Sequence, residues 1–366
     1  MPQSFEFDPA ILHSVVGGRS AVDMPALNLK TLESADAFLK GYGFDSTKPE
    51  DMERLWYFHR RALVLMQEKL GFSLEEIPEE LRERKILADP RKLLLFASQN
   101  QDSNKQKWSC ALLRCIHVFV HAESDLFSSF AEEIQKQILS PFQNCIYHDG
   151  TSGTTFLKCP EGSGSRLEPI ALLGFESKPF KTSTSTVIKL LAKPNALAMS
   201  VFDKLGVRFI TKSMFDTFQV VRFLVEENLI SFPHIMPDQS SNNLFPVDLF
   251  IRAAQELRPR AGRLSEKEIA QFFTQYLEKN KEDVEFLRKE NAFSGADYKF
   301  IKFISRKLIH VQEPGQKNAF SFFYPFEVQI VDQESHNRIL SGPSEHQAYK
   351  ERQRMAARKR LFPESP

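Results

Sequence analysis

The sequence has few of the features that mark secreted, membrane-spanning or disulfide-stabilised proteins. Its 366 residues include four cysteines, and no two of them form a C-x-x-C pair, so neither a disulfide framework nor a paired-thiol metal site is indicated. The first residues lack a basic stretch followed by an apolar segment, and no uncharged apolar run approaches the roughly 18 residues that span a bilayer. These absences predict a cytoplasmic protein with reduced thiols and no membrane association.

An excess of charge of one sign is also missing. The 48 Lys and Arg residues nearly balance the 47 Asp and Glu residues, for a net charge of +1, so the chain as a whole lacks the basic character typical of nucleic-acid binders. Only 2 Trp and 7 Tyr are present, whereas Phe reaches 33. We expect Phe to fill cores rather than to form a recognition surface. The length predicts about two domains.

The chain changes character near residue 150. Residues 1-150 show mainly helical spacing of apolar side chains, which predicts a helical N-terminal domain of unassigned role. Gly, Ser and Thr then gather in 149–165, as in loops and turns. Residues 151-366 alternate strand-like and helix-like segments, with two strands at 299–311 and 319–331 joined by a turn. The predicted fold class is therefore α+β, with a helical N-terminal domain followed by a mixed β-sheet domain flanked by helices.

Three local predictions accompany this organisation. A long helix is expected to start at Ser103 and to stop before Pro141. The Pro-, Asn- and Ser-rich segment 231–259 is expected to be irregular. Ser265 with Glu268 three residues later predicts a capping box at the start of a further helix.

The first candidate functional segment is Lys181-x-x-x-Ser185-x-x-x-Lys189. These positions share one helical face, and two ammonium groups with a hydroxyl near a helix N-terminus could hold phosphates. A solvated lysine face is the ordinary alternative.

Two further segments carry acidic residues. Asp203 precedes the apolar strand that contains Arg208, and a carboxylate there could hold Mg²⁺ together with nucleotide phosphates. A helix-capping role for Asp203, or an ion pair between Asp203 and Arg208, is the alternative. Glu327 and Gln329 lie two apart on a predicted strand, so they point to the same face. A half-exposed edge strand would explain this pair as well.

Taken in order, these segments resemble the RelA/SpoT synthetase family over roughly 170 residues. That family carries R-x-K-x-x-x-S-x-x-x-K, then D-x-x-G-x-R, then E-[VI]-Q-I-R-T with a His nine residues past its Glu, and finally a helix near E-H-x-x-x-Y-K. The residues of this chain that match are Lys181, Ser185, Lys189, Asp203, Gly206, Arg208, Glu327, Gln329, Ile330 and His336, with Glu345, His346, Tyr349 and Lys350 one residue short of the last spacing.

The resemblance implies that residues 151-366 form a RelA/SpoT-like nucleotidyltransferase domain with an insertion near 231-291. It implies transfer of pyrophosphate from ATP to a 3′-hydroxyl of a guanosine nucleotide or related purine acceptor, as in the stringent response. Asp203 and Glu327 would be catalytic and would bind Mg²⁺. The residues implied to bind nucleotide are Lys178, Lys181, Ser185, Lys189, Arg208, Tyr298, Gln329 and His336. Such a transfer depends on positioning and charge neutralisation.

The chain departs from the family pattern at three places. Pro179 stands where the first motif has Arg, with Lys178 beside it, and Val331-Asp332 replaces R-T. The acceptor loop Y-x-S-x-H falls at 298–302, where only Tyr298 is kept. These departures leave two alternatives open. One is an inactive module that senses a nucleotide or binds a partner, and the other is a relative that modifies a tRNA end.

Two more patterns have alternative explanations. His117, His121 and Asp125 lie four residues apart on a predicted helix, a spacing that can bind a metal or simply belong to a packed helix. The C-terminal helix is rich in basic residues and could contact RNA, although a solvated charged face is the ordinary reading. Its basic residues are Lys350, Arg352, Arg354, Arg358, Lys359 and Arg360.

Overall fold

The computed structural model describes residues 8–99, 103–123, 129–160, 162, 164, 167–178, 180, 183–194, 201–280, 286–287, 299–312, 319–341 and 346–363. The chain forms two compact units that are each drawn from separate stretches of sequence. Unit 1 comprises Met1–Ser128, Thr182–Val201 and Lys350–Pro366, and unit 2 comprises Ser129–Lys181 and Phe202–Tyr349. The functional domains assigned from the sequence, with a boundary near residue 150, stay a prediction, because compactness alone does not define a domain's role.

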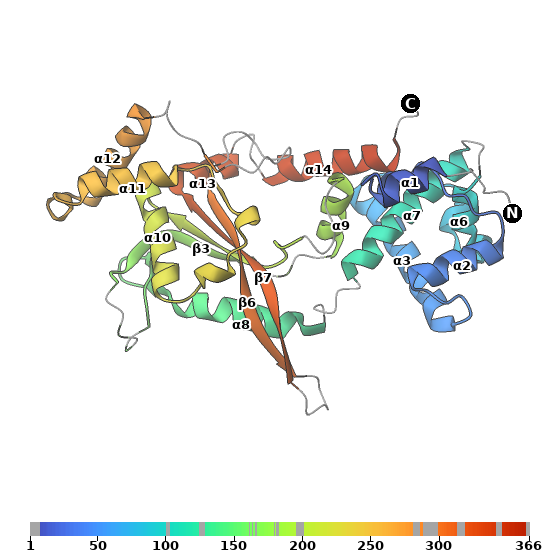
Figure 1. Ribbon diagram of the computed structural model, residues 1–366, viewed down its shortest axis with the longest axis horizontal. Coiled ribbons are helices and arrows are strands. Elements are labelled where there is room, and N and C mark those ends of the chain that lie inside the picture. The colour runs from blue at the N-terminus through green and yellow to red at the C-terminus, as the bar shows by residue number, and fades with distance from the viewer. Residues whose placement is uncertain are drawn as a thin grey trace. The chain divides into compact units, whose positions relative to one another are not determined.

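Unit 1 is helical (Figure 1). Its α-helices are α1 (Pro9–Val15), α2 (Leu32–Tyr42), α3 (Pro49–Val64), α4 (Glu79–Arg82), α5 (Arg84–Leu87), α6 (Lys92–Ala97), α7 (Asn104–Glu123), α9 (Ser183–Ala192) and most of α14 (His346–Leu361). A 3-10 turn η1 (Ala21–Asp23) follows α1, and α3 continues into a π-turn η2 (Leu65–Lys69). None of the helices among the described residues combines the length and apolarity needed to cross a bilayer.

The local sequence explains where several of these helices begin and end. Thr31 and Ser34 form a capping box at the start of α2, and Gly43, with φ of 105°, ends it in a left-handed conformation that other residues rarely adopt. Pro49 occupies the first turn of α3, where its missing N–H costs no helical hydrogen bond. α7 is the central helix of the unit, because most of its residues between Trp108 and Val120 are buried.

The C-terminal helix α14 packs within unit 1 through its basic residues. Arg360 forms an ion pair with Asp23 at 2.5 Å, and its side chain is 9% exposed. The Arg358 guanidinium donates a hydrogen bond to the Leu70 carbonyl oxygen and lies 4.0 Å from the centre of the Phe72 ring. Two of the basic residues that suggested a solvated face or an RNA contact therefore stabilise the fold.

Unit 2 is built around a seven-stranded mixed sheet, as the sequence predicts. Its order is β1-β2-β3-β4-β7-β6-β5, and every neighbouring pair is antiparallel except β4 and β7, which are parallel. The strands are β1 (Ile146–Asp149), β2 (Thr154–Leu157), β3 (Ile170–Lys178), β4 (Gly206–Thr211), β5 (Ser241–Asn242), β6 (Ile301–Gln312) and β7 (Ala319–Asp332). The predicted hairpin of two long strands corresponds to β6 and β7.

Helices complete unit 2. They are α8 (Ala131–Asn144), α10 (Met214–Glu226), α11 (Val247–Leu257), α12 (Glu266–Lys279) and α13 (Gln333–Ser341), with short 3-10 turns at Phe232–His234, Pro237–Gln239 and Ala261–Arg263. Phe142 of α8 contacts the rings of Phe209 and Phe326, so α8 covers one face of the sheet. Because side chains alternate along a strand, residues 206, 208, 327 and 329 point to the opposite face.

The structure corrects two of the local predictions and confirms one. The helix predicted from Ser103 to about 139 is two helices, α7 and α8, and Pro141 lies inside α8 rather than beyond its end. The segment 231–259 contains the regular helix α11, whose buried Leu249, Ala253 and Leu257 recur every four residues. This periodicity was outweighed by the flanking Pro, Asn and Ser. The Ser265 capping box starts α12 as predicted.

The abundance of Phe has a clear use in unit 2. α10, α11 and α12 meet in a cluster of aromatic rings in which Phe245 and Phe273 are fully buried. The rings of Phe218 and Phe250 stack with centroids 3.8 Å apart. Phe273 is the central ring of this cluster, since it contacts Phe215, Phe245 and Phe250.

We expect Phe273→Ala to lower the free energy of unfolding by about 3–5 kcal/mol, because it leaves a cavity among rings that cannot close up. The matched control is Phe232→Ala, since Phe232 is 73% exposed and its loss should change stability by less than about 0.5 kcal/mol. Urea unfolding followed by circular dichroism measures both. Equal losses in the two variants would contradict the central role of Phe273.

Candidate functional site

Two of the predicted motifs meet as neighbouring strands in unit 2. The parallel ladder between β4 and β7 places Gly206 opposite Glu327 and Arg208 opposite Gln329. The Glu327 amide donates a hydrogen bond to the Leu205 carbonyl oxygen at 2.9 Å. The segments D-x-x-G-x-R and E-V-Q-I, more than a hundred residues apart, therefore form one continuous polar row on the sheet.

Gly206 is required at this crossing for a steric reason. A Cβ atom added at residue 206 would lie 2.6 Å from the Glu327 carbonyl oxygen and 3.0 Å from the Glu327 Cβ. Real Cβ atoms essentially never come as close to another atom as 2.6 Å. The atom that a Cβ would meet is a backbone oxygen, which cannot rotate away as a flexible side chain could. The glycine of the second motif thus allows β4 to approach the strand that carries Glu327.

Glu327 is a buried carboxylate surrounded by lysines. The residue is 7% exposed, and the Lys178 ammonium donates a hydrogen bond to its Oε1 at 2.8 Å. Lys302 approaches Oε2 at 3.9 Å from the other side. A buried carboxylate needs such partners, because its desolvation is expensive.

Gln329 extends the polar row. Its Oε1 accepts hydrogen bonds from Lys178 Nζ at 3.0 Å and from Arg208 Nε at 2.9 Å. The Arg208 guanidinium also donates to Glu176 Oε2 on β3 at 2.9 Å. Four strands, β3, β4, β7 and β6, therefore contribute to a connected network of cations, carboxylates and one amide.

The network lowers the pKa of Glu327 on balance. Burial is the largest single influence and raises the pKa of this carboxyl. The charges of Lys178 and Lys302 and the Lys178 hydrogen bond together lower the pKa by more than burial raises it, so that the pKa lies below the ordinary value of 4.5. The charge of Asp203 opposes the lysines and raises the pKa of Glu327. Glu327 is consequently ionised at neutral pH, and Asp203 lies close enough for its charge to act on it.

The donor set at this site suits a hard divalent cation in its chemistry. Asp203, half-buried just before β4, and Glu327 supply carboxylates, which Mg²⁺ prefers together with phosphate and water oxygens. The described residues contain no group of three or more His, Cys, Asp or Glu side chains arranged to hold a metal by themselves. Phosphate oxygens of a nucleotide would have to complete the coordination, and Lys178 would have to leave Oε1.

The remaining predicted site residues lie elsewhere or outside the described residues. Lys181 and Tyr298 fall outside them, as does Asp125. Ser185 is exposed and Lys189 half-buried on α9, which belongs to unit 1. His336 lies on α13, and within the described parts of the chain its buried Nδ1 has no hydrogen-bond partner and no ion pair or hydrogen bond links it to Glu327.

Sequence reasoning missed two members of the network, Lys302 and Glu176. Lys302 stands at the His position of the family's acceptor loop, so a departure from the pattern brings a cation to Glu327. Only the strand register, which pairs Lys302 with Gln329 and Glu176 with Arg208, could have revealed them. Asp332, which stands where the family motif has Thr, has a structural role. Its carboxylate accepts a hydrogen bond from the Ser335 amide at 2.8 Å at the start of α13.

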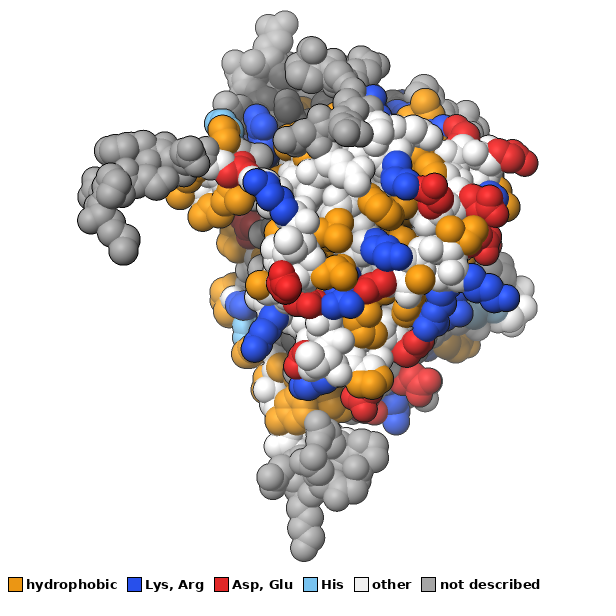
Figure 2. Space-filling view, turned by 90° about the vertical axis from the view of Figure 1, so that its right-hand side faces the viewer, with side chains coloured by type: hydrophobic (Ala, Val, Ile, Leu, Met, Phe, Trp, Pro, Cys, Tyr) orange, Lys and Arg blue, Asp and Glu red, His pale blue; other side chains and the backbone are white. Residues whose placement is uncertain are grey.

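The two other sequence patterns have structural uses. His117 Nδ1 and the Tyr42 hydroxyl share a hydrogen bond at 2.7 Å, and the His117 and His121 rings contact each other edge-on. Figure 2 shows one face of the molecule, on which basic and acidic side chains are interspersed rather than gathered into a patch of one sign. An RNA contact through α14 stays a prediction.

Comparisons with known proteins add little. No family model and no curated protein matches the chain. One matching solved structure is a GTP pyrophosphokinase family protein from Streptococcus pneumoniae, with 11% identity and a TM-score of 0.26 over 67% of this chain and 86% of that chain. A TM-score this low carries no argument about fold or function, so the case for the site depends on its own residues.

We expect Gly206→Ala to destabilise unit 2 by about 1–3 kcal/mol, the usual cost of overpacking, because β4 must move away from β7. Gly262→Ala is the matched control, since a Cβ at residue 262 meets nothing within 4 Å. Denaturant unfolding of both variants measures the difference. A Gly206→Ala protein as stable as the control would show that the close approach imposes no constraint.

The lowered pKa of Glu327 predicts how stability depends on pH. A carboxyl whose pKa falls on folding contributes stability above its unfolded pKa and loses it as the pH falls through the folded value. The wild type should therefore have a higher free energy of unfolding than Glu327→Gln at neutral pH. This difference should shrink in acid, once the pH drops below the ordinary carboxyl pKa of 4.5. Urea unfolding between about pH 3 and about pH 7 measures it. An advantage that grew on acidification would contradict the assigned ion pairs.

Proposed function

We propose that the polar row on β3, β4, β7 and β6 binds nucleotide phosphates, and that the protein is a divergent RelA/SpoT-like pyrophosphokinase. The reaction would transfer pyrophosphate from ATP to the 3′-hydroxyl of a guanosine nucleotide or a related purine acceptor. The single observation that supports it best is the meeting of the two motifs, with Gly206 against Glu327 and Arg208 hydrogen-bonded to Gln329.

The cations of the site provide the first part of the proposed mechanism. Lys178, Lys302 and Arg208 bring three positive charges to one sheet face, which suits the negative charge of a polyphosphate. Lys181, Ser185 and Lys189 stay predicted phosphate ligands. Asp203 would hold Mg²⁺, which would neutralise charge on the phosphates, and Glu327 would either join it as a metal ligand or act as the base.

Glu327 provides the second part. The acceptor 3′-oxygen would form a bond to the β-phosphorus of ATP, the bond from that phosphorus to the α,β-bridging oxygen would break, AMP would leave, and the hydroxyl proton would pass to Glu327. A carboxylate paired with lysines is a weak base. In the role of base rather than metal ligand, Glu327 would become more basic when phosphates draw Lys178 and Lys302 away, because both lysines lower its pKa.

The test uses the purified full chain with Mg²⁺, ATP labelled at the γ-phosphate, and GDP, GTP or other purine nucleotides as acceptors. We expect a labelled product that carries the pyrophosphate, and Glu327→Gln should reduce its formation by about 10²–10⁴-fold, the usual cost of losing a general base. The control is Glu226→Gln, an exposed carboxylate paired with Arg222 on α10.

Four results would change the assignment. Nucleotide binding by calorimetry without any transfer would favour the alternative of an inactive nucleotide-sensing module. The absence of both nucleotide binding and pyrophosphate transfer would overturn the proposal. Full transfer activity of the Glu327→Gln variant would overturn it as well. Labelling of bulk tRNA alone would favour the tRNA-modifying alternative.

A further inference from the structure

A cavity of about 460 Å³ lies among the helices of unit 1, in the part of the chain outside the family resemblance. Its walls are mainly aliphatic side chains, such as Leu39 of α2, Leu93 and Leu94 of α6, and Ile116 of α7. Small-molecule sites occupy roughly 300–1,000 Å³ and are lined in this way, with a few polar groups that orient the ligand. The nucleotide site proposed for unit 2 does not use this cavity.

One wall of the cavity is poorly covered. Ile11 and Val15 of α1 line it, yet they are 50% and 75% exposed, and Phe38 of α2 lines it while 40% exposed. The side chains described on α1 include no buried one. Apolar groups left in water raise the free energy of a fold, so an apolar occupant between α1 and the core would shield surface that the protein alone leaves exposed.

A neutral pair supplies the polar group of the cavity. The Tyr42 hydroxyl lies 2.7 Å from His117 Nδ1, and both residues line the wall. Burial raises the pKa of Tyr42, and burial together with His121 lowers the pKa of His117 to about 4. Both groups are therefore uncharged at neutral pH. If Tyr42 donates to Nδ1, the imidazole proton lies on Nε2, which has no hydrogen-bond partner among the described residues.

The one arginine of the wall is occupied by the fold. The two terminal nitrogens of Arg114 donate to the backbone carbonyl oxygens of Leu361 at 2.6 Å and Met24 at 2.7 Å. A guanidinium bound in this way holds α14 and the segment before α2 in place. Asn28 and Ser14 also line the wall, and beside them the imidazole N–H of His117 is a neutral donor that suits a carbonyl oxygen.

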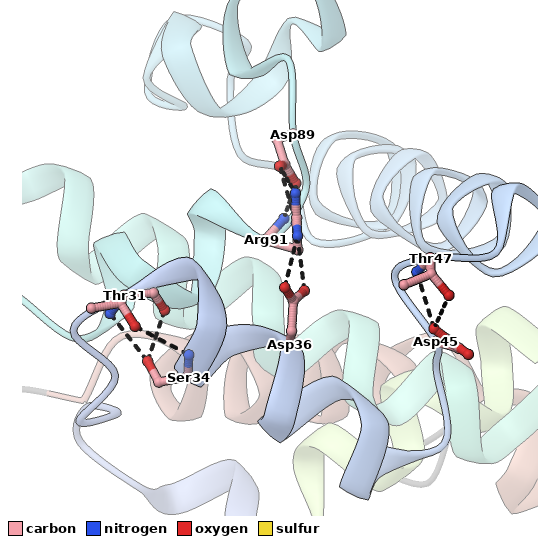
Figure 3. A network of polar contacts seen from close by, with 7 residues as sticks. All are labelled: Thr31, Ser34, Asp36, Asp45, Thr47, Asp89 and Arg91. Atoms are coloured by element: carbon pink, nitrogen blue, oxygen red, sulfur yellow. Dashed lines mark hydrogen bonds and ion pairs between the residues drawn. The ribbon is translucent and has the colours of Figure 1, made fainter.

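Polar contacts fix α2 and the start of α6, two elements that carry part of the cavity wall, and Figure 3 shows these contacts. The Arg91 guanidinium holds the carboxylates of Asp36 on α2 and Asp89 before α6, at 2.8 Å and 2.7 Å. The Thr31 and Ser34 capping box fixes the first turn of α2. The helix that carries Leu39 and Tyr42 is thus held against the segment before α6 by these polar contacts.

We propose that this cavity binds an uncharged, mainly aliphatic small molecule with one carbonyl oxygen, which accepts a hydrogen bond from His117. The aliphatic part fills the space between α2, α6 and α7, and its outer side covers Ile11 and Val15. A carboxylate is disfavoured, because the described wall also carries the acidic Asp8, and its one cation, Arg114, is directed by its hydrogen bonds toward two backbone carbonyl oxygens.

The test measures displacement of the neutral apolar dye Nile red from the full chain by methyl heptyl ketone, nonane and nonanoate. We expect the ketone to bind about fivefold more tightly than the alkane, as one ordinary hydrogen bond allows, and nonanoate to bind most weakly. His117→Phe keeps the ring but removes the donor, so it should abolish the preference for the ketone and leave nonane binding nearly unchanged.

Two variants in which tryptophan replaces alanine test whether the compounds bind in this cavity. Ala26 lines the cavity, and Ala26→Trp should fill it and abolish displacement by all three compounds. Ala122, half-buried on α7 and outside the lining, gives the matched control Ala122→Trp, which should bind as the wild type does. Displacement that survives Ala26→Trp, tighter binding of nonanoate than of the ketone, or no binding at all would overturn the proposal. A dimer that Ala26→Trp dissociates during size-exclusion chromatography, with no ligand bound, would overturn it in favour of a second copy of the chain as the occupant.

Discussion

The close approach of β4 and β7 at Gly206 is the constraint on which the rest of unit 2 depends. These are the only parallel neighbours in the described sheet, and the crossing sets the register that pairs Arg208 with Gln329. A side chain at residue 206 would displace the strand that carries Glu327. Moving that strand would separate Glu327 from Lys178 and leave a carboxylate buried without its partner, which is far more expensive than leaving both in water.

The charges of the site form a balanced group that depends on its geometry. Glu327 is stabilised by two lysines and opposed by Asp203, while Gln329 connects Lys178 to Arg208 without adding charge. Such a network is sensitive to a further anion, because a new negative group would compete with Glu327 for the lysines. Unit 1 presents the opposite chemistry, a largely apolar cavity with a neutral polar pair, so the two units suit different kinds of small molecule.

How much the sequence predicts depends on whether the signal is local. The capping box at Ser265, the mixed sheet and the long hairpin follow from periodicity and turn chemistry within short segments. The helix α11 was missed because the composition around it outweighed the spacing of Leu249, Ala253 and Leu257. Motif spacing placed Glu327 and Arg208 on one network, but Lys302 joins them through strand register, which no local pattern encodes. Lys189 stays a predicted phosphate ligand, and periodicity placed it on a helix but could not show that this helix belongs to unit 1.

The assembly of unit 1 from the two ends of the chain affects the order in which the protein can fold during synthesis. Arg360 on α14 binds Asp23 in the turn η1, and the Leu361 carbonyl oxygen accepts a hydrogen bond from the buried Arg114. Domains usually fold as they leave the ribosome, N-terminal parts first. Here Asp23 and Arg114, which belong to the stretch from α1 to α7, lack their partners on α14 until the strands of unit 2 and then α14 have been translated. Unit 1, whose helices α1 to α7 precede unit 2 in the sequence, can therefore be completed only after the strands of unit 2 have been made.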